Sequence, residues 1–410
     1  MTTDTGPLVG VRVLDLSRVL AGPWASQVLA DFGAEVIKVE QPGVGDATRT
    51  WGPPWIKDAA GAPFEAAYHH CANRGKRAVA IDFSRPEGQD LIRRLAVTSD
   101  LALENYLPGT LARFGLDHEH LAHVNPRLIT CSITGFGQDG PLARKAAYDV
   151  MIQAMGGLMS VTGLPEGEPG AGPLKVGVAI SDLMTGMYAV SALLAALHWR
   201  ERTGQGQHID LALMDTQVAW LANIAMNYLV SGAVPGRIGN ANPNIVPYQA
   251  FATADGHLLL AVGTDPQFLA LCRVLGRPDL AVDARFATNA ARVEHRGALV
   301  PALAEVLRAR STATWVAMLE EAGIPCGPVQ DLAAVFAHPQ VQHRGLRLDL
   351  PHPVVGSVPS VANPVHFAAT PVTYRGASPP LGWHTREVLG ELGLSSEEID
   401  RLAAAGVVGV

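Results

Sequence analysis

One carboxylate in the sequence stands where a nucleophile could act. Asp182 directly follows Ser181, a residue type that favours the start of a helix, and a small apolar run at 176–180 leads up to it. The positive end of a helix dipole keeps a carboxylate ionised and nucleophilic. Aspartate in a first helical turn also serves as a simple cap, so this position alone leaves both interpretations open.

Other arrangements that carry chemistry are incomplete. The run 118–123 (HEHLAH) has Ala122 where a zinc-protease motif needs its second histidine, which favours a solvated histidine-rich helix. We expect His69 and His70 to serve in packing. The glycines at 43–45 lack the rest of a dinucleotide fingerprint, and no GxSxG elbow is present. The sequence therefore predicts neither a metal site nor a hydrolase nucleophile.

The composition favours a two-domain enzyme that acts on a small molecule. A chain of 410 residues exceeds what one core usually organises. Hydrophobic residues make up 48% and charged residues 17%, which predicts a large buried interior. So few charged residues cover only a limited exposed surface, as is typical of an oligomer. The net charge of −7, without any dense Lys/Arg run, argues against a nucleic-acid partner.

The cysteines and apolar stretches predict a cytoplasmic location. Four scattered cysteines without a CxxC pair are typical of reduced thiols. The polar segment 1–7 lacks signal-peptide features. The most apolar helical stretch, 190–197, is shorter than the ~20 residues that span a bilayer, so we expect no membrane partner.

The first third of the chain alternates short apolar runs with helical segments, and Gly33 suits a helix end. This alternation favours parallel strands with right-handed crossovers, and hence a doubly wound α/β domain. Strands are expected at 11–16, 35–40, 78–82, 101–104 and 128–132, and helices at 24–32 and 86–97.

The rest of the chain changes character. A smaller mixed domain is expected between about Pro235 and Cys326, with a hairpin turning at Asp255-Gly256. The other expected elements are a long helix from Asp182 to about Arg202, a strand at 208–213, a helix near 297–310, an extended tail at 353–380 and short helices at 387–405.

Several further segments follow one another in a fixed order over nearly the whole chain. They are LDLS at 14–17, AGP at 21–23, FGAEVIKVE at 32–40, NRGKR at 73–77, ENY at 104–106 with Gly109, Arg113 and Gly115, NPRLI at 125–129, GFGQDGP at 135–141, Asp182 with Gly186, TGQGQ at 203–207 and GIPCGP at 323–328. The ordered set resembles the family III CoA-transferases of the CaiB/BaiF type, which include formyl-CoA and carnitine CoA-transferases.

The resemblance implies an α/β fold. A Rossmann-like, doubly wound large domain would be formed by residues 1–205 and 330–410, and residues 206–329 would supply a linker and a smaller α+β domain. Two such chains would interlock as a homodimer, each threaded through the other.

The resemblance also implies the site. The catalytic aspartate of the family falls on Asp182. The CoA-contacting positions of the family fall on Val19, Leu20, Asn73, Arg74, Lys76, Asn105 and Arg113. The basic residues among them could simply be solvated at the surface. Binding of the CoA phosphates would explain why they lie on one loop system.

The implied chemistry is covalent catalysis. Asp182 attacks the thioester carbonyl of an acyl-CoA and forms a mixed anhydride, and the released CoA thiolate converts this to an aspartyl-CoA thioester. The acceptor acid then attacks that thioester, and CoA returns to the new acyl group. Because a thioester is exchanged for a thioester, no metal, ATP or permanently bound cofactor is needed. The expected partners are an acyl-CoA and a small carboxylic acid.

Two departures bear on the substrate. Formyl-CoA enzymes have glutamine at the position of Leu20 and a run of four glycines over the site, and both are missing here, so oxalate is not the expected acceptor. The segment IVPYQAF at 245–251 resembles the branch that uses succinyl-CoA with glutarate or related dicarboxylates. Arg18 and Arg237 are candidate partners for the second carboxylate, and Tyr148 and Asp149 are further candidate substrate residues.

Three alternatives remain. The α-methylacyl-CoA racemases of the same superfamily use a His and an Asp, but the position of the His holds Tyr148, a poor base with a pKa near 10. The adjacent Asp149 either assists the transferase site or caps a helix. A non-catalytic CoA-binding protein and a thioester hydrolase are the other readings. The sequence does not name the donor and acceptor or the order of release.

Overall fold

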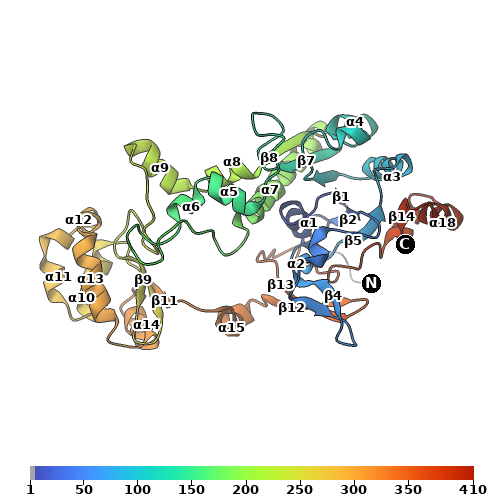
Figure 1. Cartoon of the computed structure of the whole chain (residues 1–410). Helices are drawn as coiled ribbons and strands as arrows, with labels where there is room; N and C mark the ends of the chain where they lie inside the picture. The colour runs from blue at the N-terminus through green and yellow to red at the C-terminus, as the bar shows by residue number, and fades with distance from the viewer. Residues whose placement is uncertain (1–4) are drawn as a thin grey trace. The chain divides into compact units, whose positions relative to one another are not determined.

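A seven-stranded sheet organises the first of the two units into which the chain divides (Figure 1). The structure is a computed structural model that describes residues 5–410. The first unit contains the chain up to Leu158 together with Val176–Met226 and Gln340–Val410, and the second contains Met159–Lys175 and Asn227–Pro339. This division assigns residues 206–226 to the sheet-containing unit and residues 159–175 and 330–339 to the other, which differs from the boundaries drawn from the sequence.

The sheet has the strand order of a dinucleotide-binding fold. Its order is β14-β5-β2-β1-β6-β7-β8, so the first six strands in chain sequence lie in the order 3-2-1-4-5-6 and are parallel, with β14 antiparallel at one edge. The strands are β1 (Arg12–Asp15), β2 (Glu35–Glu40), β5 (Arg77–Ile81), β6 (Leu101–Glu104), β7 (Ile129–Thr134), β8 (His208–Ala212) and β14 (Val408–Gly409). The expectation of a large, mainly parallel α/β sheet is confirmed.

Helices cover both faces of this sheet because its strands alternate apolar side chains to either side. Val13 and Leu103 face α1 (Ala21–Asp31) and α7 (Ile180–Thr203), whereas Leu14 and Ala102 face the opposite core. The helices of that second core are α3 (Pro86–Val97), α4 (His118–Val124), α17 (Thr385–Glu391) and α18 (Ser396–Ala404).

Helix α7 crosses the core beside α1. It is long and apolar enough to meet a length-and-composition test for a membrane-crossing helix, a test that the core helices of other proteins also meet. Gly186 allows the close packing, because a Cβ there would lie 2.7 Å from the carbonyl oxygen of Ala21. The contact fixes the start of α7 against the start of α1.

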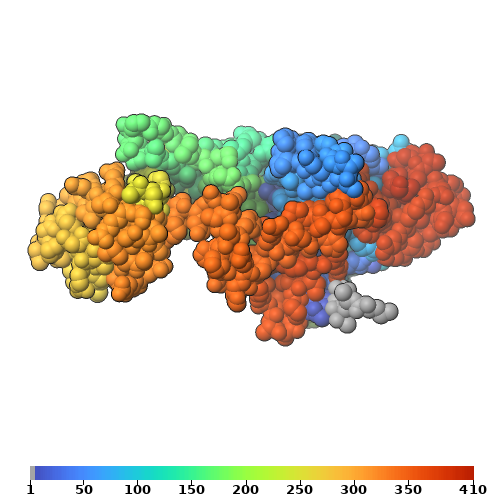
Figure 2. Space-filling view, turned by 90° about the horizontal axis from the view of Figure 1, so that it is seen from below, coloured from blue at the N-terminus to red at the C-terminus, as the bar shows by residue number. Residues whose placement is uncertain are grey.

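The C-terminal segment returns to the first unit. Strand β14 pairs with β5, and α17 packs on the same strand. The space-filling view shows this segment, in orange and red, spread beside the blue N-terminal elements (Figure 2). Strands β12 (Arg347–His352) and β13 (Gly356–Val361) form a hairpin, of which β13 lies within the segment 353–380 that was expected to be extended.

The second unit has its own core around a three-stranded antiparallel sheet. Strand β9 (Tyr248–Ala252) and β10 (His257–Ala261) form the expected hairpin, and β11 (Cys326–Pro328) pairs with β10. Its main helices are α10 (Asp265–Val274), α11 (Pro278–Val282), α12 (Asn289–Glu294), α13 (Arg296–Leu307) and α14 (Thr312–Glu321).

Candidate active site

The loops after β1 and β6 meet at the point where the strand order reverses. The backbone N–H of Arg18 donates to Asn105 Oδ1 (2.8 Å), and Asn105 Nδ2 donates to the carbonyl of Arg18 (2.7 Å). The guanidinium of the exposed Arg18 lies 4.3 Å from the ring centre of Tyr106. Ligands of doubly wound sheets bind at such a switch point. The structure thus brings three of the predicted residues, Arg18, Val19 and Asn105, to this place.

Val19 holds a strained backbone conformation in this loop. Its φ of 69° lies in the left-handed region, which is costly for a β-branched residue. The backbone N–H donates to Asp46 Oδ2 (3.0 Å), and the buried Lys38 ammonium donates to the same oxygen (3.1 Å). Leu20 follows as the buried N-cap of α1. The ion pair of Lys38 and Asp46 therefore holds the loop in its strained form.

Asn73 and Lys76 belong to a fully buried network under the site. The three N–H bonds of Lys76 are all used inside the protein, by Asp15 Oδ2 (3.1 Å), the carbonyl of Pro23 (2.9 Å) and Asn73 Oδ1 (2.8 Å). Burial lowers the pKa of Lys76 to about 8, against the attraction of Asp15. Although burial opposes it, the ammonium groups of Lys76 and Lys38 lower the pKa of Asp15 to about 2.

Arg74 is likewise occupied inside the protein. Its Nε and Nη2 donate to the two oxygens of Asp31 (2.9 and 2.6 Å), and its Nη1 donates to Ser360 Oγ (3.2 Å) and the carbonyl of Val361 (2.9 Å). The bidentate pair ties α1 to the C-terminal hairpin. Surface solvation, the alternative considered for these cations, is wrong for Arg74 and Lys76, which are 5% and 4% exposed.

Asp182 lies in the first turn of α7, which begins at Ile180. The prediction that Ser181 is the N-cap is wrong: the N-cap position is Ala179, which makes no side-chain cap. The cap comes from another helix, because Asp149 Oδ1 accepts from the backbone N–H groups of Ser181 (2.8 Å) and Asp182 (3.3 Å). Of the two roles weighed for Asp149, capping is the one that the geometry shows.

The charge state of Asp182 follows from this arrangement. Burial raises the pKa of its carboxyl to about 7, and the neighbouring Asp149 carboxylate adds to the rise. Within residues 5–410, no group donates a hydrogen bond to the Asp182 side chain. Asp182 is one turn from Gly186 and so shares the α7 face that packs on the start of α1. Among the residues that the structure describes, the Asp182 carboxylate therefore has no hydrogen-bond donor, and it lies on the side of α7 that faces the start of α1.

Two neighbouring groups were not predicted as part of the site: Tyr68 was not noticed, and His69 was expected to serve in packing. The Tyr68 phenol lies within electrostatic reach of both aspartates, and burial, followed by the charges of Cys71, Asp182 and Asp149, raises its pKa to about 12. His69 is buried and its Nδ1 lies 3.0 Å from Thr48 Oγ1, which also bonds Asp46 (2.8 Å). No local pattern marks these residues, because only the tertiary fold brings 46–48 and 68–69 together.

Three other predicted residues each have surroundings of their own. Arg113 is exposed and lies over the ring of Phe114 at 5.9 Å. Tyr148 is 61% exposed at the N-cap of α5 (Asp149–Met155). In the second unit, Arg237 pairs with Glu166 (2.6 Å) and donates to the carbonyl of Leu164 (3.2 Å).

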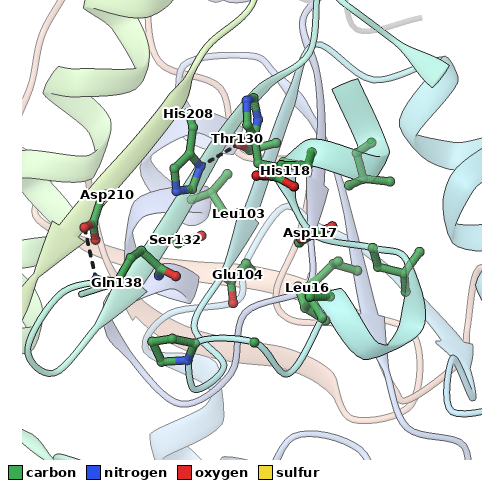
Figure 3. Close-up of a pocket in the computed structure, with 18 of the residues that line it drawn as sticks. Leu16, Leu103, Glu104, Asp117, His118, Thr130, Ser132, Gln138, His208 and Asp210 are labelled. Atoms are coloured by element: carbon green, nitrogen blue, oxygen red, sulfur yellow. Dashed lines mark hydrogen bonds between the residues drawn. The ribbon is translucent and has the colours of Figure 1, made fainter. Parts of the chain in front are cut away.

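A separate cavity of about 380 Å³ lies on the sheet face covered by α4. Figure 3 shows Glu104 and Gln138 directed into it and Thr130 hydrogen bonded to His208. The distances from Thr130 Oγ1 to the Nδ1 atoms of His118 and His208 are 2.8 and 2.9 Å. Its lining contains carboxylates but neither lysine nor arginine, so it does not suit phosphates or dicarboxylates. None of the predicted CoA contacts lines it. Across residues 5–410, no cluster of three or more His, Cys, Asp or Glu could hold a metal ion.

The strand order gives the sheet a switch point between β1 and β6, and no group of residues 5–410 donates a hydrogen bond to the Asp182 side chain. Residues 8–385 match the family described as CoA-transferase family III. The chain is 50% identical to the succinate–glutarate CoA-transferase of Agrobacterium fabrum over 97% of both chains, and 42% identical to the human succinyl-CoA:glutarate CoA-transferase over 98% of this chain and 90% of that one. A solved CaiB/BaiF family protein from Brucella suis superposes with a TM-score of 0.83 at 47% identity, covering 95% of this chain and 100% of that one.

The chain belongs to CoA-transferase family III and is a CoA-transferase. The family membership predicted from the ordered sequence segments is confirmed.

Proposed function

We propose that this chain transfers CoA from succinyl-CoA to glutarate or a closely related dicarboxylate. The names of its relatives supply the substrate class. The observation that carries the catalytic proposal is the Asp182 carboxylate, which accepts no hydrogen bond from any group of residues 5–410 and lies one turn before Gly186, the residue of α7 that packs on the start of α1.

Asp182 acts as the nucleophile. Its ionised carboxylate attacks the succinyl thioester and releases CoA thiolate, leaving a succinyl-aspartyl anhydride. The thiolate attacks the aspartyl carbonyl and frees succinate. Glutarate attacks the resulting aspartyl-CoA thioester, and the thiolate finally takes the glutaryl group from the new anhydride. Over the whole cycle one thioester is exchanged for another, so no further reactant is consumed.

CoA binds at the switch point. Val19, Leu20 and Asn105 shape this place through the strained loop, and the exposed Arg113 is the predicted contact best placed to meet a phosphate. Asn73, Arg74 and Lys76 support the same loop system from within, because their polar groups are already paired. The exposed guanidinium of Arg18 is the proposed partner for the far carboxylate of the acceptor, and Arg237 remains a second proposed partner.

The active form is proposed to be an interlocked homodimer in the cytoplasm. Tyr188 and Trp199 are exposed on the same face of α7, three turns apart, and α9 (Ala222–Ser231) has no buried residue although it carries Leu229 and Val230. Exposed apolar surface of this kind marks a contact between proteins. The four free cysteines fit a reducing compartment.

A transfer assay tests the reaction. Purified protein is mixed with succinyl-CoA and one of glutarate, itaconate, malate, citramalate, oxalate, formate or carnitine, and new acyl-CoA species are identified by mass spectrometry. Glutaryl-CoA that forms with the wild type and not with Asp182→Ala supports the proposal. The absence of exchange with every acceptor, or equal exchange in the variant, would refute it.

A further inference from the structure

Gln153 connects Asp149 to the loop that leads into α7. It lies in α5 and its side chain is fully buried. Its Nε2 donates to Asp149 Oδ2 (2.6 Å), and its Oε1 accepts from the backbone N–H of Val176 (2.8 Å). One amide therefore holds both the residue that caps α7 and the segment that precedes Asp182.

The orientation of this amide is determined by its neighbours. The backbone N–H of Val176 can only donate, so the amide oxygen must face it. The NH₂ group then faces Asp149 Oδ2 and, at 3.4 Å, the carbonyl of Val178, both of which are acceptors. Asp149 accepts a hydrogen bond from Gln153 on one carboxylate oxygen and from two backbone N–H groups on the other. Both of its oxygens are therefore used as acceptors.

The other side of the first turn of α7 is held as well. Ser181 Oγ donates to Oε1 of the buried Gln217 in α8 (Leu213–Ala219) at 2.7 Å. A Cβ at Gly156, the residue that ends α5, would lie 2.6 Å from Gln217 Cγ, so α5 and α8 approach closely only with glycine there. The turn that carries Asp182 is thus fixed from two helices, and only Gln153 acts through a charged group.

We propose that Gln153 is a positioning residue for CoA transfer, which keeps Asp149 in place as the cap of α7 and through it sets the direction and charge state of the nucleophile. The inference rests on the proposed role of Asp182. Without the amide donor, Asp149 is released from the first turn, and Asp182 loses both its fixed backbone and the negative neighbour that favours its protonated form.

The test compares Gln153→Met with Gln153→Glu across pH. Gln153→Met is expected to lower kcat by about 10- to 100-fold, the cost of a small misplacement of a reacting group, with far smaller changes in KM. Its rising pH limb is expected to move to lower pH. In Gln153→Glu the protonated acid can still donate to Asp149, so the ratio of its kcat to that of the wild type should be highest at acid pH and fall as pH rises.

Gln267→Glu is the matched control. Gln267 is the N3 residue of a capping box at the start of α10, where glutamate supplies the same acceptor, so its pH profile should equal that of the wild type. The proposal is overturned if both Gln153 variants keep the wild-type kcat and pH profile. It is also overturned if both variants lose kcat by the same factor at every pH.

A second readout does not depend on turnover. The gain in stability that Asp182→Asn gives at pH 8 relative to pH 5 is measured by urea unfolding, once alone and once with Gln153→Met. The gain should shrink in the Gln153→Met background, and an unchanged gain counts against the positioning role. If the wild type exchanges no CoA while this coupling is present, the proposed function fails and the structural coupling stands.

Discussion

The Asp182 carboxylate must be ionised to attack a thioester, but its surroundings favour the protonated acid. Burial and the charge of Asp149 raise its pKa to about 7, far above that of an ordinary aspartate. The ionised form of such a carboxylate is poorly stabilised by its surroundings. A poorly stabilised anion is a more reactive nucleophile. The same shift determines how both rate and stability depend on pH.

The rate of transfer is expected to rise with pH. Because only the ionised form of Asp182, the proposed nucleophile, can attack, kcat/KM for succinyl-CoA should increase about tenfold per pH unit below 7 and level off above it. Initial rates of glutaryl-CoA formation between pH 5.5 and 8.5, at succinyl-CoA concentrations well below KM, give the profile of the free enzyme. A rate that is flat over this range shows that the ionisation of Asp182 does not limit the reaction.

Asp182→Asn should abolish transfer but stabilise the fold. Between the ordinary aspartate pKa near 4 and the raised value near 7, the unfolded chain has lost a proton that the folded chain retains, so this group makes stability fall as pH rises. Removing it should add about 1–3 kcal/mol to the free energy of unfolding at pH 8 and almost nothing at pH 4.

Urea unfolding at the two pH values measures this difference. Asp215→Asn, in the first turn of α8 on an exposed residue, is the control that should change stability little at either pH. A loss of stability in Asp182→Asn at pH 8 contradicts the assigned charge state.

At the scale of elements, glycine sets how closely α7 approaches α1. A methyl group at Gly186 would meet the Ala21 carbonyl oxygen at 2.7 Å, so Gly186→Ala should cost about 1–3 kcal/mol of stability and displace the turn that carries Asp182. Gly390→Ala is the matched change in α17, where a Cβ meets nothing within 4 Å, and it should be neutral or slightly stabilising. Thermal unfolding and kcat of both variants test this; equal stability of the two contradicts the packing argument.

The buried ion pair of Lys76 and Asp15 is expected to stabilise the sheet-containing unit. Lys76→Met leaves Asp15 as an unpaired buried charge, which should cost about 3–5 kcal/mol of stability. Adding Asp15→Asn removes that charge and should recover part of the loss. A double-mutant cycle by urea unfolding measures the coupling, and strictly additive effects would show that the two side chains do not interact.

The sequence predicted elements better than it predicted side-chain partners. Strand β2 and helix α3 lie at the expected residues, because apolar alternation and Pro86 are local signals. The cap of α7 was misassigned to Ser181 because the true cap, Asp149, lies 32 residues earlier in the chain. Lys76 and Arg74 were expected to face CoA, and nothing local shows that Asp15 and Asp31, 61 and 43 residues away, bury them. Which side chains form ion pairs over such sequence separations depends on the topology of the fold, and a single sequence does not show that topology directly.

At the scale of the whole molecule, the fold leaves an apolar face on α7 without a partner. The residues of α7 that face the core, such as Leu193 and Leu197, are buried, whereas Tyr188 and Trp199 are exposed on another face. In the second unit, Leu229 and Val230 of helix α9 are separately exposed, at 71% and 80%. Surface of this composition is expected to be buried by a second copy of the chain.

The proposed dimer can be measured directly. Light scattering after gel filtration should give twice the 43.2 kDa mass of one chain, and dilution to nanomolar concentration should leave the mass unchanged because threaded chains separate only by unfolding. Trp199→Asp places a charge on the proposed contact and should reduce both the dimer fraction and the transfer rate. Val282→Asp changes an equally apolar, 85% exposed residue of α11 in the second unit and should alter neither. A wild-type monomer with full transfer activity would show that a single chain contains the complete site, and that the exposed face of α7 has another role.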